Sequence, residues 1–231
     1  MTSAATTNFD RSGWWDEDCS AFRSLRSVNR FRLDLLHEWF PQGFRGMDLV
    51  DLGCGGGLLS VPLATDGARV TGVDVAREAL QDASVRGGPN FRAVVADLCT
   101  APLPDSCADL VLLADVVEHV DDPALALATA ARLLRPGGHL FVNTISRTFA
   151  SRVLAIWAAE GLGFVPRGTH QWERFVTPLE LDAMATASGL TRVALVGEAP
   201  RLLATLRHRA IVLAPSGRTS VGYAALYRRA A

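Results

Sequence analysis

The chain contains no lysine, so all 23 of its Lys and Arg positions are arginines. This absence excludes a Schiff-base lysine and the lysine of a phosphate-binding P-loop. No apolar run approaches the length of a membrane span, and the polar N-terminus lacks the apolar stretch of a signal peptide. With a net charge of −1, the chain gives no support for a nucleic-acid-binding surface, and we expect no nucleic-acid partner.

The four cysteines, Cys19, Cys54, Cys99 and Cys107, lack the paired spacing of metal ligands. Cysteines without such spacing fit a reducing compartment, so we expect a cytoplasmic protein. A chain of 231 residues that is 49% hydrophobic can bury the core of one α/β domain. No repeat or low-complexity linker divides it, and we therefore expect a single domain.

Strand-like and helix-like segments alternate through the middle of the chain. We expect strands at 48–52, 70–73, 91–95, 110–114 and 139–144, with helices at 58–65, 77–84 and 123–134. The segment 1–8 is expected to be disordered, and 9–40, which includes Trp14 and Trp15, to be helical. Further helices are expected at 146–161 and 177–188, and strands at 193–196, 210–213 and 221–227. This alternation predicts a doubly wound, mostly parallel α/β sheet.

The segment 50–60, V-D-L-G-C-G-G-G-L-L-S, has four glycines in five residues after the first expected strand. Glycine lets the backbone turn tightly and approach a ligand closely. The next strand ends in Asp74, 21 residues after Gly53. This spacing fits a βαβ unit in which the acid accepts hydrogen bonds from a ribose. The sequence therefore predicts a nucleoside-binding site.

The kind of nucleoside follows from what the glycine loop lacks. A nicotinamide or flavin site requires G-x-G-x-x-G, and a leucine stands at the third position when Gly53 and Gly55 are aligned with the first two. A P-loop requires G-K-[ST], which is absent. The remaining class binds a nucleoside that carries a positive sulfonium and no phosphate.

Three carboxylates stand at or near strand ends and suit such a ligand. Asp74 is placed for the ribose, Asp97 for the exocyclic amine of adenine, and Asp51 to balance the cationic end. The alternative is that these acids are turn and cap residues, which strand ends also favour.

The order of these parts resembles a class I S-adenosyl-L-methionine-dependent methyltransferase. The motifs D-L-G-C-G-G-G, V-T-G-V-D, V-V-A-D and D-L-V-L-L-A-D-V-V-E-H-V, with the turn L-L-R-P-G-G-H-L, span 49–144. Outside that core, F-D-R-S-G-W-W-D, L-R-S-V-N-R-F-R-L-D and V-P-R-G-T-H-Q-W-E-R-F-V-T-P-L-E-L are similar to segments of the ubiquinone-biosynthesis O-methyltransferase family. The resemblance implies methylation of a catechol-type hydroxyl on a polyprenylated ring.

The resemblance also implies a Rossmann-like sheet of seven strands and a division of the chain. A helical cover is expected at 9–46, the cofactor core at 47–145, an inserted lid at 146–176 and the rest of the sheet at 177–231. Arg32, Gly53, Asp74 and Ala114 match family residues that contact the cofactor, Arg32 through the cofactor's carboxylate. The expected cofactor contacts are completed by Asp51, Gly55, Val75, Asp97 and Leu98.

A metal site is implied at Asp115, Glu118 and His119, which match a family acid-x-x-Glu-His motif for a divalent cation. On a helical turn these positions would share one face, and their ligand types suit Mg²⁺, Mn²⁺ or Zn²⁺. The alternative is a negatively charged helix N-terminus with a packed histidine and no metal. Asp115 departs from the family's usual glutamate.

A phenol has a pKa of about 10 and attacks poorly when protonated, so methyl transfer needs help in removing the proton. A metal could lower the pKa of the hydroxyl, and His119 or His170 could act as a general base. We expect metal-assisted binding of the catechol, with His170 near the ring.

The segment 148–164 is associated in the family with reaching a lipid substrate, which implies peripheral contact with the inner membrane. The alternative is a lid helix over the site. The stretch 197–200, G-E-A-P, lacks the family's Tyr-Asn-Pro at the expected cover of the ring. Methyl transfer to nitrogen or carbon of a small molecule, O-methylation of a secondary metabolite and a non-catalytic nucleoside-binding module therefore stay open, as does the oligomeric state.

Overall fold

The computed structural model describes residues 12–17, 19, 22–166 and 168–231. The expected disorder at 1–8 and the start of the helix expected from residue 9 lie outside these residues. Gly13 to Glu17 form turns, so the expectation that Trp14 and Trp15 belong to a helix is wrong. The first described helix is α2, Arg23–Trp39, whose buried face includes Leu35 and Leu36.

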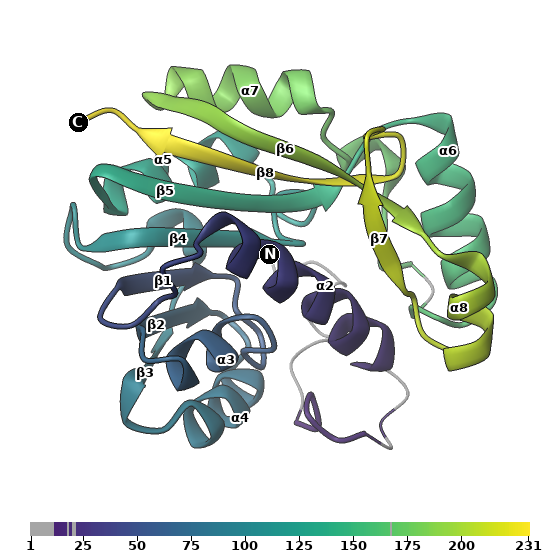
Figure 1. Ribbon diagram of the computed structural model, residues 1–231, viewed down its shortest axis with the longest axis horizontal. Helices are drawn as coiled ribbons and strands as arrows, with labels where there is room; N and C mark the ends of the chain where they lie inside the picture. Colours follow the sequence, from purple (N-terminus) through teal and green to yellow (C-terminus); the bar gives the residue numbers. More distant parts are fainter. Residues whose placement is uncertain (1–11, 18, 20–21, 167) are drawn as a thin grey trace.

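A sheet of eight strands forms the centre of the molecule, in the order β3-β2-β1-β4-β5-β8-β6-β7 (Figure 1). The strands are β1 Asp48–Leu52, β2 Arg69–Asp74, β3 Phe91–Val95, β4 Ala108–Ala114, β5 Leu134–Ile145, β6 Leu190–Pro200, β7 Leu213–Ser216 and β8 Gly222–Arg229. The pairs from β3 to β5 are parallel, and β8, β6 and β7 join antiparallel. The expected doubly wound α/β sheet is confirmed, with eight strands where seven were expected.

Helices cover both faces of this sheet (Figure 1). They are α3 Ser60–Thr65, α4 Arg77–Gly87, α5 Pro123–Leu133, α6 Phe149–Ser151, α7 Pro178–Ala187 and α8 Leu202–His208. Apolar residues of α2, α3 and α4 share one buried cluster with Leu110, Leu112 and Phe141. Residues of α5 and α7 share another with Val111 and Val142. Alternate residues of β4 and β5 thus face opposite layers, as a sheet buried on both faces requires.

The largest departures from the expected elements lie in the second half of the chain. The turn expected at 135–138 lies within β5, which continues through it with an irregularity in its pairing to β4. The helix expected at 146–161 is α6 followed by a π-helix, Arg152–Glu160. The segment expected as a strand at 210–213 forms none before Leu213, and α8 was not expected. No helix among the described residues is both long and apolar enough to cross a bilayer.

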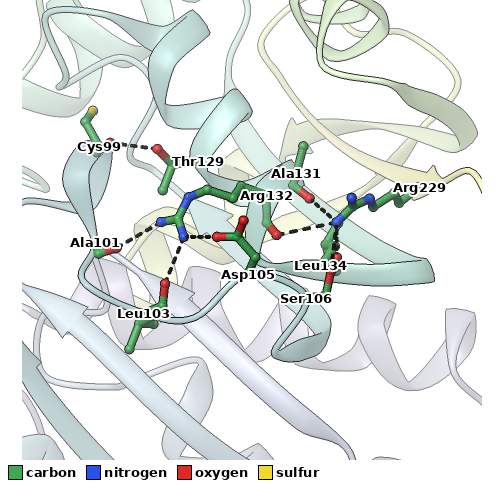
Figure 2. A network of polar contacts seen from close by, with 10 residues as sticks. All are labelled: Cys99, Ala101, Leu103, Asp105, Ser106, Thr129, Ala131, Arg132, Leu134 and Arg229. Carbon is green, nitrogen blue, oxygen red and sulfur yellow. Dashed lines mark hydrogen bonds and ion pairs between the residues drawn. The ribbon is translucent and has the colours of Figure 1, made fainter.

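A polar network fixes the loop that follows β3 (Figure 2). The guanidinium of Arg132, on α5, donates to the carbonyls of Ala101 at 2.9 Å and Leu103 at 2.8 Å. It also pairs with Asp105 at 2.7 Å, while Arg229 donates to the carbonyl of Ala131 at 3.0 Å. These contacts join α5 to the loop between β3 and β4 and to the end of β8, and so support the amino ends of β4 and β5, at the edge of the sheet opposite the carboxyl ends of the parallel strands.

Candidate active site

Polar residues line the carboxyl edge of the sheet in strand order. Asp97 follows β3, Asp74 ends β2 and Asp115 follows β4. Asn143 lies near the end of β5, and Glu198 lies near the end of β6, which runs parallel to β5 because both are antiparallel to β8. Ligands of open α/β sheets bind outside the carboxyl ends of the strands, so this edge is the candidate site.

The glycine loop begins at Gly53, directly after β1. Its φ of +79° is a conformation that favours glycine, and its N–H donates to the carbonyl of Val73 at 2.7 Å. A Cβ at this position would come within 2.7 Å of the side chain of Val116. The absence of a side chain therefore lets the loop touch the segment that follows β4.

The carboxylate of Asp74 holds the glycine loop in place. One oxygen accepts a hydrogen bond from the N–H of Gly55 at 2.7 Å and the other from the N–H of Ala76 at 2.8 Å. Val75, which follows, is exposed. The carboxylate thus lies at the end of β2, beside the glycine loop, where the sequence predicts a ribose-binding acid.

Asp97 is exposed and caps a short helical turn, where its side chain accepts from the N–H of Cys99 at 2.8 Å. This is the capping role that the sequence left as an alternative. Leu98 lies close to Gly53. Asp51 is buried in β1, and burial raises its pKa to about 7, with the charge of Asp74 adding to the rise.

Two tryptophans cover the glycine loop, which sequence reasoning missed by placing them in a helix. A Cβ at Gly55 or Gly56 would lie within 2.5 Å of the ring or Cβ of Trp14. The indole N–H of Trp15 donates to the carbonyl of Gly56 at 2.8 Å. The W-W pair beside a glycine-rich loop therefore packs onto the loop, a contact that no local periodicity encodes.

Arg32 is buried on α2 and forms an ion pair with Asp115 at 2.6 Å. Its other terminal nitrogen donates to Asn29 at 3.1 Å, while its Nε has no hydrogen-bond partner. Asp115 has a φ of +53°, unusual for a residue other than glycine, and its N–H donates to the carbonyl of Asn143 at 3.0 Å. Ala114 pairs with Asn143 at the end of β4 and directly precedes Asp115.

Two further carboxylates lie in the field of Arg32. Burial raises the pKa of Glu118 to about 8, with the charge of Asp115 adding to the rise. Thr144 donates a hydrogen bond to one oxygen of Glu118 at 2.8 Å, and the other oxygen has no partner. Glu198 is also buried and accepts a hydrogen bond from the side-chain amide of Asn143.

His170 and Glu160 form a buried pair beside this cluster. Nδ1 of His170 lies 3.0 Å from Oε1 of Glu160, which also accepts from the backbone N–H of His170 at 2.9 Å. The rings of His119 and His170 are 6.2 Å apart. Burial lowers the pKa of both histidines, to about 4 for His119, so both are neutral at pH 7. Sequence reasoning named both histidines but missed Glu160, because the pairing depends on the fold of 160–170.

The structure does not bring the expected metal ligands together. Residues 116–119 form a single turn, and the positive φ of Asp115 puts that residue outside it, so the expectation that the ligands share a helical face is wrong. Asp115 is paired with Arg32 and Glu118 is bonded to Thr144. No group of three His, Cys, Asp or Glu side chains among the described residues is arranged to hold a metal ion. These residues, as arranged, do not fit a divalent cation.

Comparisons with known proteins agree with the geometry of this edge. The family described as "Methyltransferase domain" matches residues 50–142. The chain is similar to the ubiquinone biosynthesis O-methyltransferase of Idiomarina loihiensis, with 39% identity over 191 residues, 80% of this chain and 78% of the relative. For the same enzyme of Methylobacterium sp. (strain 4-46), identity is 43% over 193 residues, with 77% and 76% covered.

Among solved structures, the fold matches magnesium protoporphyrin IX methyltransferase from Synechocystis PCC 6803 with bound SAH (S-adenosylhomocysteine). The TM-score is 0.66 at 17% identity, and the match covers 98% of this chain and 93% of the other. At this identity the likeness shows the fold alone.

Proposed function

Because the chain belongs to the ubiquinone biosynthesis O-methyltransferase family, we propose that it transfers the methyl group of S-adenosyl-L-methionine to a ring hydroxyl of a catechol or phenol in ubiquinone biosynthesis. The glycine loop, Asp74 and Arg32 would hold the methyl donor. The observation that carries the chemistry is the buried His170–Glu160 pair beside the segment after β4.

In this reaction the hydroxyl oxygen attacks the methyl carbon, a C–O bond forms, and the C–S bond breaks with its electrons left on sulfur. The hydroxyl proton must leave. A neutral imidazole whose Nδ1–H donates to Glu160 presents Nε2 as a proton acceptor, so His170 is the proposed general base. The carboxylate of Glu160 would fix that tautomer and stabilise the imidazolium that forms.

The test is transfer of labelled methyl from S-adenosyl-L-methionine to a panel of catechols and polyprenylated catechols. His170→Ala and Glu160→Gln are expected to lower kcat by about 100-fold or more, with little change in cofactor Kd. His37→Ala removes an exposed histidine that also faces a carboxylate, Asp66, and serves as the matched control. Full turnover by His170→Ala would exclude His170 as the base.

A separate experiment tests whether a metal takes part in the reaction, because the expected ligands, as arranged, do not fit a divalent cation. Activity would be measured after metal-free preparation, with a strong chelator and then with added Mg²⁺, Mn²⁺ or Zn²⁺. Activity that depends on one of these ions would restore the metal that the family motif implies and would require an arrangement of Asp115, Glu118 and His119 other than the one in this structure.

The acceptor is proposed to be polyprenylated and reached at a membrane surface. Phe149 and Leu162 are exposed on the segment expected to contact lipid. Leu203 is exposed on α8, a helix that lies at the same end of the molecule as α6 in Figure 1, and the stretch 199–209 contains arginines but no Asp or Glu. Exposed apolar side chains among basic residues suit an anionic lipid surface.

Co-sedimentation with vesicles containing anionic lipid tests this contact. The variants Phe149→Asp and Leu203→Asp are expected to pellet less than the wild type, with unchanged turnover of a water-soluble catechol. Equal pelleting of all three proteins would exclude these residues from a membrane contact.

A further inference from the structure

The buried charges around Arg32 do not balance. Three carboxylates act on this one guanidinium, those of Asp115, Glu198 and Glu118, and together they raise its pKa although burial opposes the rise. All four side chains are buried or largely buried, with exposed fractions between 3% and 28%. With all groups ionised, the cluster carries an excess of negative charge in a place that water hardly reaches.

The packing of β6 against β8 places Glu198 in this cluster. A Cβ at Gly197 would lie 2.0 Å from the carbonyl oxygen of Arg218, so the residue before Glu198 must be glycine for the loop after β7 to approach. A Cβ at Gly222, the strand partner of Glu198, would lie 3.1 Å from the carboxylate. The two glycines therefore make the space in which a buried carboxylate ends beside Asn143.

The polar atoms of the cluster are also incompletely satisfied. Nε of Arg32, Oε1 of Glu118 and Oδ1 of Asn143 are buried without a hydrogen-bond partner. Buried polar groups are normally paired, and a buried excess charge is relieved by a proton, a metal or a cationic ligand. The described residues offer no metal site here, so a proton and a cationic ligand remain.

The cluster lies at the transfer end of the proposed methyl-donor site. The strand order puts Asp97 and Asp74 at one end of the row and Asp115 and Glu198 at the other, with the glycine loop between them. Gly53 approaches Val116, which directly follows Asp115. A nucleoside held by Asp74 and Asp97 would therefore extend its far end, which carries the sulfonium, towards the carboxylates.

We propose that the negative charge of Glu198 makes the site bind the sulfonium of S-adenosyl-L-methionine in preference to the neutral thioether of S-adenosylhomocysteine. The proposal rests on the proposed methyl-donor function. The donor and the product differ by one methyl group and one positive charge at sulfur, so a carboxylate in a low-dielectric site stabilises the donor more than the product. The product is then released more readily after transfer.

Calorimetric titration with each ligand, without an acceptor, tests the inference. The titration is done at about pH 8, because burial raises the pKa of Glu198 to about 7 and the carboxyl is ionised above that value. Glu198→Gln keeps the shape and an oxygen for Asn143 but removes the charge, and Glu198→Asp keeps the charge. The ratio of the product Kd to the donor Kd is expected to fall about three- to tenfold in Glu198→Gln. In Glu198→Asp it should stay within about twofold.

Glu38→Gln, an exposed carboxylate on the same helix as Arg32, is the control for net charge and should leave the ratio unchanged. Sinefungin, an analogue with an amine in place of the sulfonium, should follow the donor in every variant. An unchanged ratio in Glu198→Gln, or a fall only in Glu198→Asp, would mean that Glu198 serves packing alone and overturns the inference. Failure of the wild type to bind either ligand would overturn the methyl-donor function itself, which is a different result.

Discussion

The two ends of the polar row at the sheet edge are built on opposite principles. At the cofactor end, the carboxylates of Asp74 and Asp97 accept hydrogen bonds from backbone N–H groups of the loops around them, those of Gly55 and Ala76 for Asp74 and that of Cys99 for Asp97. At the transfer end, Arg32 and Glu118 are buried and each has an atom without a partner. The first end uses its carboxylates to hold backbone loops, whereas the second keeps buried polar atoms that have no partner among the described residues.

The contrast suggests a division of work. A preorganised loop contributes affinity for the shared nucleoside without distinguishing its charge state, because the same hydrogen bonds form to donor and product. A buried cluster with an excess of negative charge responds to the one feature that changes in the reaction. Variants that remove one charged or hydrogen-bonding side chain at one end at a time test whether the two ends differ in this way.

The largest effect is expected from Arg32→Met, which removes a buried guanidinium that faces the carboxylates of Asp115, Glu118 and Glu198. Breaking a buried pair by removing one partner leaves uncompensated charge, so we expect the free energy of unfolding to fall by about 3–5 kcal/mol near pH 8. Arg132→Met is the control, because the side chain of Arg132 is 36% exposed. Its loss should cost about 1 kcal/mol. Urea denaturation measures both, and an equal cost would remove the distinction between strained and satisfied arginines.

A smaller effect is expected from Asp74→Asn at the cofactor end. The carboxylate now accepts hydrogen bonds from two backbone N–H groups. In the variant, the amide nitrogen of asparagine would face one of these donors, so the hydrogen bond is lost and the loop loosens at Gly55 or Ala76. Loss of a charge-assisted bond of this kind should weaken binding by about 2–3 kcal/mol, or roughly 30- to 150-fold in Kd. Calorimetry should show donor and product weakened alike. A selective loss of the donor would assign charge recognition to Asp74 instead of Glu198.

The cofactor end was readable from the sequence because its chemistry is local. The spacing from Gly53 to Asp74 reflects one βαβ unit, and each acid bonds within a few residues or across one strand pair. The transfer end was readable only in part. Arg32 and Glu118 were named through a family resemblance, whereas Glu198 and Glu160 were not, because their contacts join segments 10 to 55 residues apart through the sheet and the 160–170 loop.

A pH effect on stability reports the buried carboxyls without mutation, two of them at the transfer end and Asp51 in β1 at the cofactor end. Burial raises the folded-state pKa of Asp51 and Glu198 to about 7 and that of Glu118 to about 8, well above the values of an unfolded chain. The folded protein therefore holds more protons than the unfolded chain up to these values, and stability falls as the pH rises through them. The lowered pKa values of His119 and His170 act in the opposite direction, but only below about pH 6.5.

We therefore expect the ligand-free protein to lose about 2–3 kcal/mol of unfolding free energy between about pH 6.5 and 8.5. Thermal denaturation across this window measures the loss. Saturating donor should reduce it because the sulfonium offsets the carboxylates, whereas saturating product should not. Stability that rises through the window would mean that the three carboxyls are ionised at low pH and that the transfer end is not strained.

The smallest effect is expected from Asp97→Ala, which deletes an exposed cap. Loss of the bond to the N–H of Cys99 should cost about 0.5–1 kcal/mol of stability, because water replaces the carboxylate at an exposed helix start. Asp122→Ala is the matched control, since Asp122 is also exposed and caps α5 through the N–H of Leu125 at 3.0 Å. If Asp97 also binds adenine, its variant should weaken donor and product alike by about fivefold, while the control changes stability only. Equal binding by both variants would leave Asp97 a cap and confine specific recognition at this end to the glycine loop and Asp74.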